Sequence, residues 1–246
     1  MKKVLRKTLK ITGITLLVLI AAAIVIPILF KKQITNVVKQ EINKNLTAKV
    51  DFKDVSLSFF RHFPRISISL KELSVAGTNE FEGDTLIAAK TLDASVNLLS
   101  VIRGVNIKVY GVYLESPRIH ALINKEGKAN WDITKDNGDT TTSTDNSPSE
   151  FKMSLQKYEI NDGYILYKDE SSDMTAEISG LDHEGSGDFT EDVFKLATKT
   201  KADAARFTYA SIPYLVNAKT VIGADIQIDN SSNKYTFRTD DIAVND

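Results

Sequence analysis

The sequence predicts a mainly β protein whose strands follow an N-terminal transmembrane helix. Residues 11–30 form an uncharged apolar run, and from residue 49 onward apolar and polar residues alternate with a period of two. That period is typical of strands with one buried face. Helical patterns do not recur between the strands, which argues against a parallel α/β fold. We therefore expect an antiparallel sheet with strands of about five to seven residues.

The run from Ile11 to Phe30 is long enough to cross a bilayer as a helix. Five basic residues precede it and two follow it: Lys2, Lys3, Arg6, Lys7 and Lys10, then Lys31 and Lys32. This asymmetry predicts that residues 1–10 are a cytoplasmic tail and that the rest lies across the membrane. A cleaved signal peptide is the alternative, but its apolar run is usually about 7–15 residues long, and no small-residue cleavage site follows here.

Residues 31–48 predict an amphipathic helix next to the membrane. The apolar residues recur at helical spacing: Ile34, Val37, Val38, Ile42 and Leu46. Two interpretations remain open. The helix either caps the β core or lies on the lipid headgroups.

The body divides into two β-rich segments, residues 49–134 and 151–246. Residues 135–150 contain no apolar side chain and cannot contribute to a core, so we expect a flexible polar linker there. We also expect the second segment to be truncated at Asp246 and the chain to be part of a longer protein.

Two local breaks in the alternation predict specific backbone features. The alternation through Ile66, Ile68 and Leu70 slips at Glu72, which predicts a β-bulge or a sharp bend. In the second segment, Asp162-Gly163 lies between two apolar runs, which predicts a hairpin turn.

Composition and motifs give no support for catalysis or for nucleic-acid binding. The net charge is −1, and cysteine is absent. His62, His120 and His183 share no ligand spacing, and residues 169–173 (DESSD) lack the glycine and final glutamate of a calcium loop. We expect no catalytic residue, no metal and no cofactor, and we expect that the protein is not an enzyme. Nucleic acid is not an expected partner.

The order of parts resembles the N-terminal portion of the AsmA-like family of Gram-negative envelope proteins, which are related to TamB-like and bridge-like lipid transfer proteins. The resemblance covers nearly the whole chain. It rests on the basic start and the apolar run, on VDFKDVSLSFFRHFPRISISLKELSVAG, on GDTLIAAKTLDASVNLLSVIRG, and on ESPRIHALINKEGKANWDI. The last segment carries a P-x-I…N…G…NW pattern at Pro117, Ile119, Asn124, Gly127, Asn130 and Trp131.

This resemblance implies a single-pass inner-membrane anchor with the body in the periplasm. It implies an elongated, curved, groove-like β-sheet that carries phospholipid toward the outer membrane, with membrane, phospholipid and envelope assembly proteins as partners. Family members carry no catalytic pattern. Candidate lipid-facing residues share a face on two strands: Ile66, Ile68, Leu70, Ile119, Ala121 and Ile123.

Two other function classes remain open. One is a non-catalytic, membrane-tethered scaffold that assists outer-membrane protein assembly, which a closed and dry β-sandwich core would favour. The other is a membrane-anchored hydrolase, which needs a converged acid–base cluster that the sequence does not show.

Overall fold

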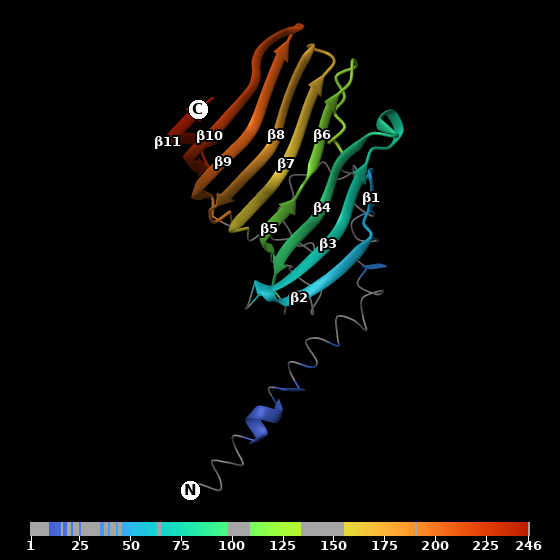
Figure 1. Cartoon of the computed structure of the whole chain (residues 1–246), viewed down its shortest axis with the longest axis vertical. Coiled ribbons are helices and arrows are strands. Elements are labelled where there is room, and N and C mark those ends of the chain that lie inside the picture. Colours follow the sequence, from blue (N-terminus) through green and yellow to red (C-terminus); the bar gives the residue numbers. More distant parts are fainter. Residues whose placement is uncertain are drawn as a thin grey trace.

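The computed structural model describes residues 10–15, 17–18, 21, 25, 35–36, 39, 43, 46–62, 65–97, 109–133, 155–189 and 191–245. Within this part of the chain the fold is one large sheet (Figure 1). Its strands are β1 (Lys49–Asp51), β2 (Asp54–His62), β3 (Arg65–Ala76), β4 (Thr85–Val96), β5 (Val109–Glu115), β6 (Arg118–Ile123), β7 (Lys157–Asp169), β8 (Met174–Ser186), β9 (Val193–Tyr209), β10 (Ile212–Asp229) and β11 (Lys234–Val244). A short 3-10 helix, η1 (Asn79–Phe81), precedes β4.

The eleven strands follow the order β1-β3-β4-β5-β7-β8-β9-β10-β11, with β2 paired to β3 and with β6 paired to both β4 and β7. A mainly β fold was predicted correctly. Strands from both sides of residues 135–150 pair with each other in this sheet, because β5 and β6 lie against β7.

The expectation of a purely antiparallel sheet is wrong. The β5–β7 and β6–β7 pairs are parallel, and the other pairs are antiparallel, so the sheet is mixed. We call the two parallel pairs the parallel seam. A period of two places side chains on faces but carries no information on strand direction, which is why the pattern did not reveal the seam.

The expected strand length and one expected hairpin are also wrong. β9 and β10 contain 17 and 18 residues. Asp162 and Gly163 do not turn the chain but lie inside β7, where the register against β8 shifts. Asp162 has a φ of 49°, so it forms a bulge in a continuous strand. An Asp-Gly pair supplies the same backbone freedom to a bulge as to a turn.

Several strands carry a residue with positive φ at a similar level of the sheet. They are Glu72 in β3, Ser116 between β5 and β6, Asp162 in β7, Gly180 in β8 and Asn217 in β10. We call this line the crease. The positive φ of Glu72 confirms the irregularity predicted there. The crease also divides the sheet into two halves: the first half contains β2 and β5, and the second half contains β1 and β6.

The crease keeps the apolar residues on one face. An ideal Cβ atom on Gly163 would lie 2.8 Å from Cγ2 of Ile160 and 3.3 Å from Cβ of Leu181. Gly163 and Ile160 therefore point to the same face although they are three residues apart, because the bulge at Asp162 changes the phase of the alternation. The apolar positions change phase at the same place, from Ile160 to Ile165. We call the face shared by these two residues the apolar face.

The buried core lies where β1 to β4 meet. Its cluster contains Ala48, Val50, Phe52, Val55, Leu70, Leu73, Val75, Leu86 and Ala89. Half-buried side chains that pack against it include Leu46, Ile68 and Ile133.

The predicted amphipathic segment 31–48 contacts the sheet at β1. Of its described residues, Thr35, Asn36, Lys39 and Asn43 are helical, but residues 46–48 are not, so the predicted helix does not extend to residue 48. The Asn43 side chain accepts a hydrogen bond from the Val50 backbone N–H (3.0 Å) and donates one to the Val50 carbonyl (3.1 Å). The Lys39 ammonium lies 4.8 Å from the centroid of the Phe52 ring. These contacts agree with a helix that caps the sheet.

Most of the predicted transmembrane run, residues 11–30, lies outside the described residues. Those that are described, including Ile11, Ile14 and Leu17, are helical and exposed. Among the described residues, no helix has the length and apolar character needed to span a bilayer.

Candidate functional site

The second half of the apolar face presents rows of apolar side chains that run across the strands. Directly paired residues in neighbouring strands share a face. One row runs through Ile87, Ile119, Ile165, Ile178 and Ala205 on β4, β6, β7, β8 and β9. A second row runs through Ala121, Tyr167, Ala176, Phe207 and Leu215 on β6 to β10. All ten side chains are half-buried.

The two aromatic rings of the second row each lie near another ring. The Trp131 and Tyr167 rings lie 6.1 Å apart, and Trp131 is 43% exposed. The Phe207 and Tyr214 rings lie 6.0 Å apart. This surface offers an apolar contact area without a charged residue in either row.

The structure places the six predicted lipid-facing residues in two different environments. Ile66 and Leu70 on β3 are only 4% and 6% exposed and belong to the packed clusters, with the half-buried Ile68 between them. Ile119, Ala121 and Ile123 on β6 are half-buried, and the first two begin the rows described above. The β3 residues are thus core residues, and the β6 residues lie on the more open part of the same face.

The sequence did not reveal that the apolar rows continue from β6 onto β7, and from there onto β8 and β9. The apolar run in residues 164–167 and the alternation in residues 174–178 both predict strands. The mistaken hairpin at Asp162 hid that residues 157–169 form one strand, and the parallel seam that joins Ile119 to Ile165 could not be read from the pattern.

The first half of the apolar face is more polar on β8 and β9. The Tyr158 hydroxyl lies 3.1 Å from His183 Nε2, and His183 Nδ1 lies 2.8 Å from Thr200 Oγ1. Burial lowers the pKa of His183 and raises the pKa of Tyr158. The imidazole is therefore neutral at pH 7, with one ring nitrogen donating and the other accepting.

This chain of hydrogen bonds lacks the features of a nucleophilic site. Thr200 has a possible base in His183, but the third group is the Tyr158 phenol, which cannot stabilise an imidazolium as a carboxylate does. The nearest strand carboxylates, Glu159 and Glu184, point to the opposite face, because they alternate with Tyr158 and His183. The arrangement is suited to satisfying polar groups within the sheet.

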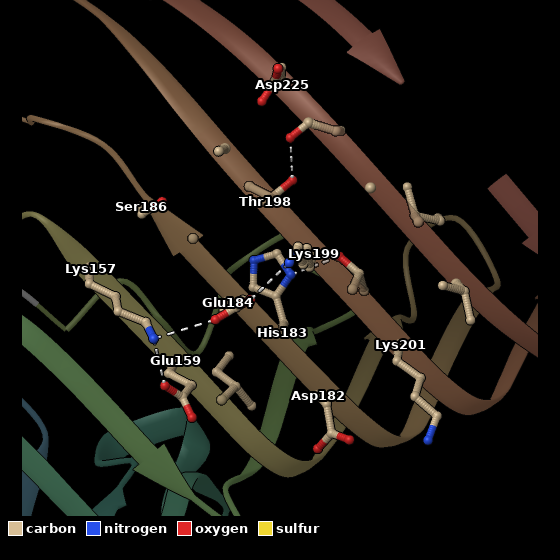
Figure 2. A pocket seen from close by; sticks show the side chains of 18 of the residues that line it. Lys157, Glu159, Asp182, His183, Glu184, Ser186, Thr198, Lys199, Lys201 and Asp225 are labelled. Atoms are coloured by element: carbon tan, nitrogen blue, oxygen red, sulfur yellow. Dashed lines mark hydrogen bonds and ion pairs between the residues drawn. The ribbon is translucent and has the colours of Figure 1, made fainter. Parts of the chain in front are cut away.

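A shallow depression of about 770 Å³ lies over the same strands, and Figure 2 shows its side chains. Its charged lining residues are Lys157, Glu159, Asp182, Glu184, Lys199, Lys201 and Asp225. They belong to the face opposite the apolar one, since each alternates with an apolar-face residue along its strand.

Most of these charges compensate each other. Lys157 lies 3.2 Å from Glu159 and 3.4 Å from Glu184, and Lys199 lies 3.9 Å from Glu184. The hydrogen bond to Glu159, together with Glu184, raises the pKa of Lys157. A carboxylate paired with an ammonium is a poor general acid, so the depression gives no support for acid–base catalysis.

Within the described ranges, no group of three or more His, Asp or Glu side chains is placed to hold a metal ion. His120 lies edge-on to Tyr164 with ring centroids 5.9 Å apart, on another strand from His183. Asp169, in the DESSD segment, accepts hydrogen bonds from the Ser171 and Ser172 backbone N–H groups. Its carboxylate closes a turn.

Comparison with known proteins identifies one family. The model of the AsmA family matches residues 1–236, which is most of the chain. No curated protein and no solved structure matches the chain.

Proposed function

Because the chain belongs to the AsmA family, we propose that it handles phospholipid on the apolar face of its sheet. Membership in this family indicates an envelope-related function. Phospholipid as the ligand is proposed in addition to this. One observation carries it: the two half-buried rows that cross β6 to β9 contain no charged residue.

An acyl chain matches the chemistry of these rows. Apolar contact is non-directional, and each methylene that leaves water contributes about 0.8 kcal/mol. A lipid lying across Ile119, Ile165 and Ile178 would place its chains on aliphatic side chains and leave its headgroup in water. Transfer along such a surface needs no covalent step, so we propose a non-catalytic protein without a cofactor.

The proposal includes an anchor in the inner membrane. Residues 11–30 would span it once, with residues 1–10 in the cytoplasm and the sheet in the periplasm, as the flanking charges favour. Phospholipid would move toward the outer membrane along the apolar face, and envelope assembly proteins would be partners at its far end.

Photocrosslinking of the full chain tests the lipid proposal. A phosphatidylethanolamine with a photoreactive acyl chain is incorporated into membranes that contain the protein, and the labelled peptides are identified by mass spectrometry. We expect label on β6 to β9. Ala176→Asp should reduce that label about tenfold, which corresponds to about 1.4 kcal/mol, because it sets a charge against the acyl chain.

Thr175→Asp is the matched control. Thr175 is the preceding residue on β8, is also half-buried, and points to the opposite face. Thr175→Asp should leave the labelling unchanged. Both variants keep residues 11–30, so lipid bound around that segment labels them equally. Equal labelling of the two variants, or no label on β6 to β9 in the unmodified protein, would contradict lipid handling by this face. The non-catalytic scaffold would then be the better function.

A further inference from the structure

A relay of three hydrogen-bonded side chains lies in the first half of the apolar face. It runs from Tyr158 on β7 through His183 on β8 to Thr200 on β9, and all three side chains are half-buried. Burial lowers the pKa of His183, so the imidazole is neutral, with one donor and one acceptor nitrogen. The relay satisfies both nitrogens, but it does not use every hydroxyl hydrogen.

The hydroxyl hydrogen that is left over belongs to Thr200. A phenol is more acidic than an aliphatic hydroxyl, so Tyr158 is the stronger donor and donates to Nε2 of His183. The Nδ1–H group then donates to the Thr200 oxygen over 2.8 Å. Among the described residues the Thr200 hydroxyl has no second hydrogen-bond partner, so its hydrogen is available to a ligand.

The surroundings of the relay favour an uncharged ligand group. Two rows of paired residues cross this part of the apolar face, and neither contains a Lys, Arg, Asp or Glu side chain. The first row is Leu114, Ile160, His183, Thr200 and Ile222, and the second row is Val112, Tyr158, Gly185, Thr198 and Ala224. A phosphate would bring its charge to rows without a cation, which costs far more than bringing a neutral carbonyl.

An uncharged path leads from the relay across the crease to the aliphatic rows of the second half. Leu181 on β8 and Ala202 on β9 each lie two residues from the relay, so they share its face. They are 5% and 4% exposed. Ile178 follows on β8, five residues from His183, which is about 16 Å at the rise of a strand. One leaflet of a bilayer has a hydrocarbon thickness of about 15 Å, so an acyl chain fits this distance.

We propose that the Thr200 hydroxyl donates a hydrogen bond to the ester carbonyl of a phospholipid, and that the acyl chain extends from there over the crease to Ile178. This inference rests on the proposed function and adds the orientation of the lipid to it. The carbonyl oxygen is a neutral acceptor and suits a single neutral donor among apolar residues. The phosphate stays in water.

Two photoreactive phosphatidylethanolamines test this orientation on the full chain in membranes. One carries the photoreactive group on the acyl carbon next to the ester, and the other carries it at the end of the acyl chain. Labelled residues are identified by mass spectrometry. The ester probe should label β7 to β9 in the first half of the sheet, and the terminal probe should label these strands in the second half. The reverse pattern, or the same pattern for both probes, would overturn the proposal.

Thr200→Val tests the hydrogen bond itself. Its added methyl takes the place of the hydroxyl, so labelling of the first half by the ester probe should fall about fivefold, which corresponds to about 1 kcal/mol. Labelling of the second half by the terminal probe should persist, which shows that the sheet is intact. Thr200→Ser keeps the hydroxyl and should keep the ester-probe label.

Thr198→Val is the matched control. Thr198 is half-buried on the same face of β9, but its hydroxyl donates to the Ala224 carbonyl (3.1 Å) and is not part of the relay. Its substitution should leave both patterns unchanged. Equal loss of ester-probe label in the two valine variants would overturn the role of Thr200 and leave lipid handling in place. Absence of label on β6 to β9 from both probes would contradict lipid handling as well.

Discussion

At the scale of single residues, glycine decides whether an aromatic ring can lie flat on the sheet. The Tyr158 ring covers Gly185 on the neighbouring strand, where an ideal Cβ atom would come within 2.3 Å of the ring. Gly223 on β10 has open space, with no atom within 4 Å of its ideal Cβ position. The two positions therefore make a matched pair.

We expect Gly185→Ala to destabilise the protein by about 1–3 kcal/mol, since the added methyl forces Tyr158 away from its place beside His183. Gly223→Ala should be neutral or should stabilise by up to about 1 kcal/mol, by restricting the unfolded chain. Urea unfolding followed by circular dichroism measures both. Equal effects of the two substitutions would contradict this account of Gly185.

The same turn occurs at the ends of β7 and β10. Asp169 and Asp229 each end a strand, and each accepts hydrogen bonds from the backbone N–H groups two and three residues later. The segments read D-E-S-S-D and D-N-S-S-N, and both fifth residues have positive φ. Hydrogen bonds from Ser231 and Ser232 lower the pKa of Asp229 to about 2.

The lowered pKa of Asp229 gives a pH dependence with a definite sign. A folded-state pKa of about 2, against an ordinary value of 3.8, means that the ionised carboxylate contributes stability above about pH 3.8. That contribution is lost as the pH falls toward 2. The stability difference between the unmodified protein and Asp229→Asn should therefore narrow over this range in urea titrations. A difference that widens as the pH falls would contradict the assignment.

At the scale of elements, the sequence predicted which residues are in strands better than where strands end. The alternation correctly marked Ile66 to Leu70 and Ile119 to Ile123 as strand faces, and the slip at Glu72 is a real irregularity. The similar slip at Asp162 was taken for a turn. A bulge and a turn use the same residues, and only the pairing partner, which is distant in sequence, distinguishes them.

For the same reason, only part of the candidate site could be predicted from the sequence. Ile119 and Ala121 were found from their own strand, but the rows they begin depend on β7, β8 and β9. Whether an apolar residue lies in a core or on an open face is also a property of the whole sheet. Ile66 and Ile119 look alike in sequence, yet Ile66 is buried and Ile119 is half-exposed.

At the scale of the whole molecule, one sheet joins strands from both sides of residues 135–150. β5 and β6 form eleven residue pairs with β7, counting five and six in the two ladders. These pairs do not depend on a continuous chain through residues 135–150, so the sheet should survive a cut there.

We expect that a protease site inserted between Gly138 and Asp139 can be cleaved without separating the two pieces. The cleaved protein should elute as one species in size-exclusion chromatography, while a denaturing gel shows two bands. Adding urea to the column should separate the pieces. Two separate species without denaturant would contradict a shared sheet.

The parallel seam also has a consequence for the order of assembly during synthesis. β1 to β4 can pair as soon as they emerge, because their partners are close in sequence. β5 and β6 can then pair with β4, but their other edge must wait for β7, which begins at Lys157, well after Ile123. Closing a loop of this length costs about 3 kcal/mol of chain entropy before the first pair forms. Seam formation should therefore be the slow step of folding, and a nascent chain stalled before residue 157 would expose the strand that later meets β7.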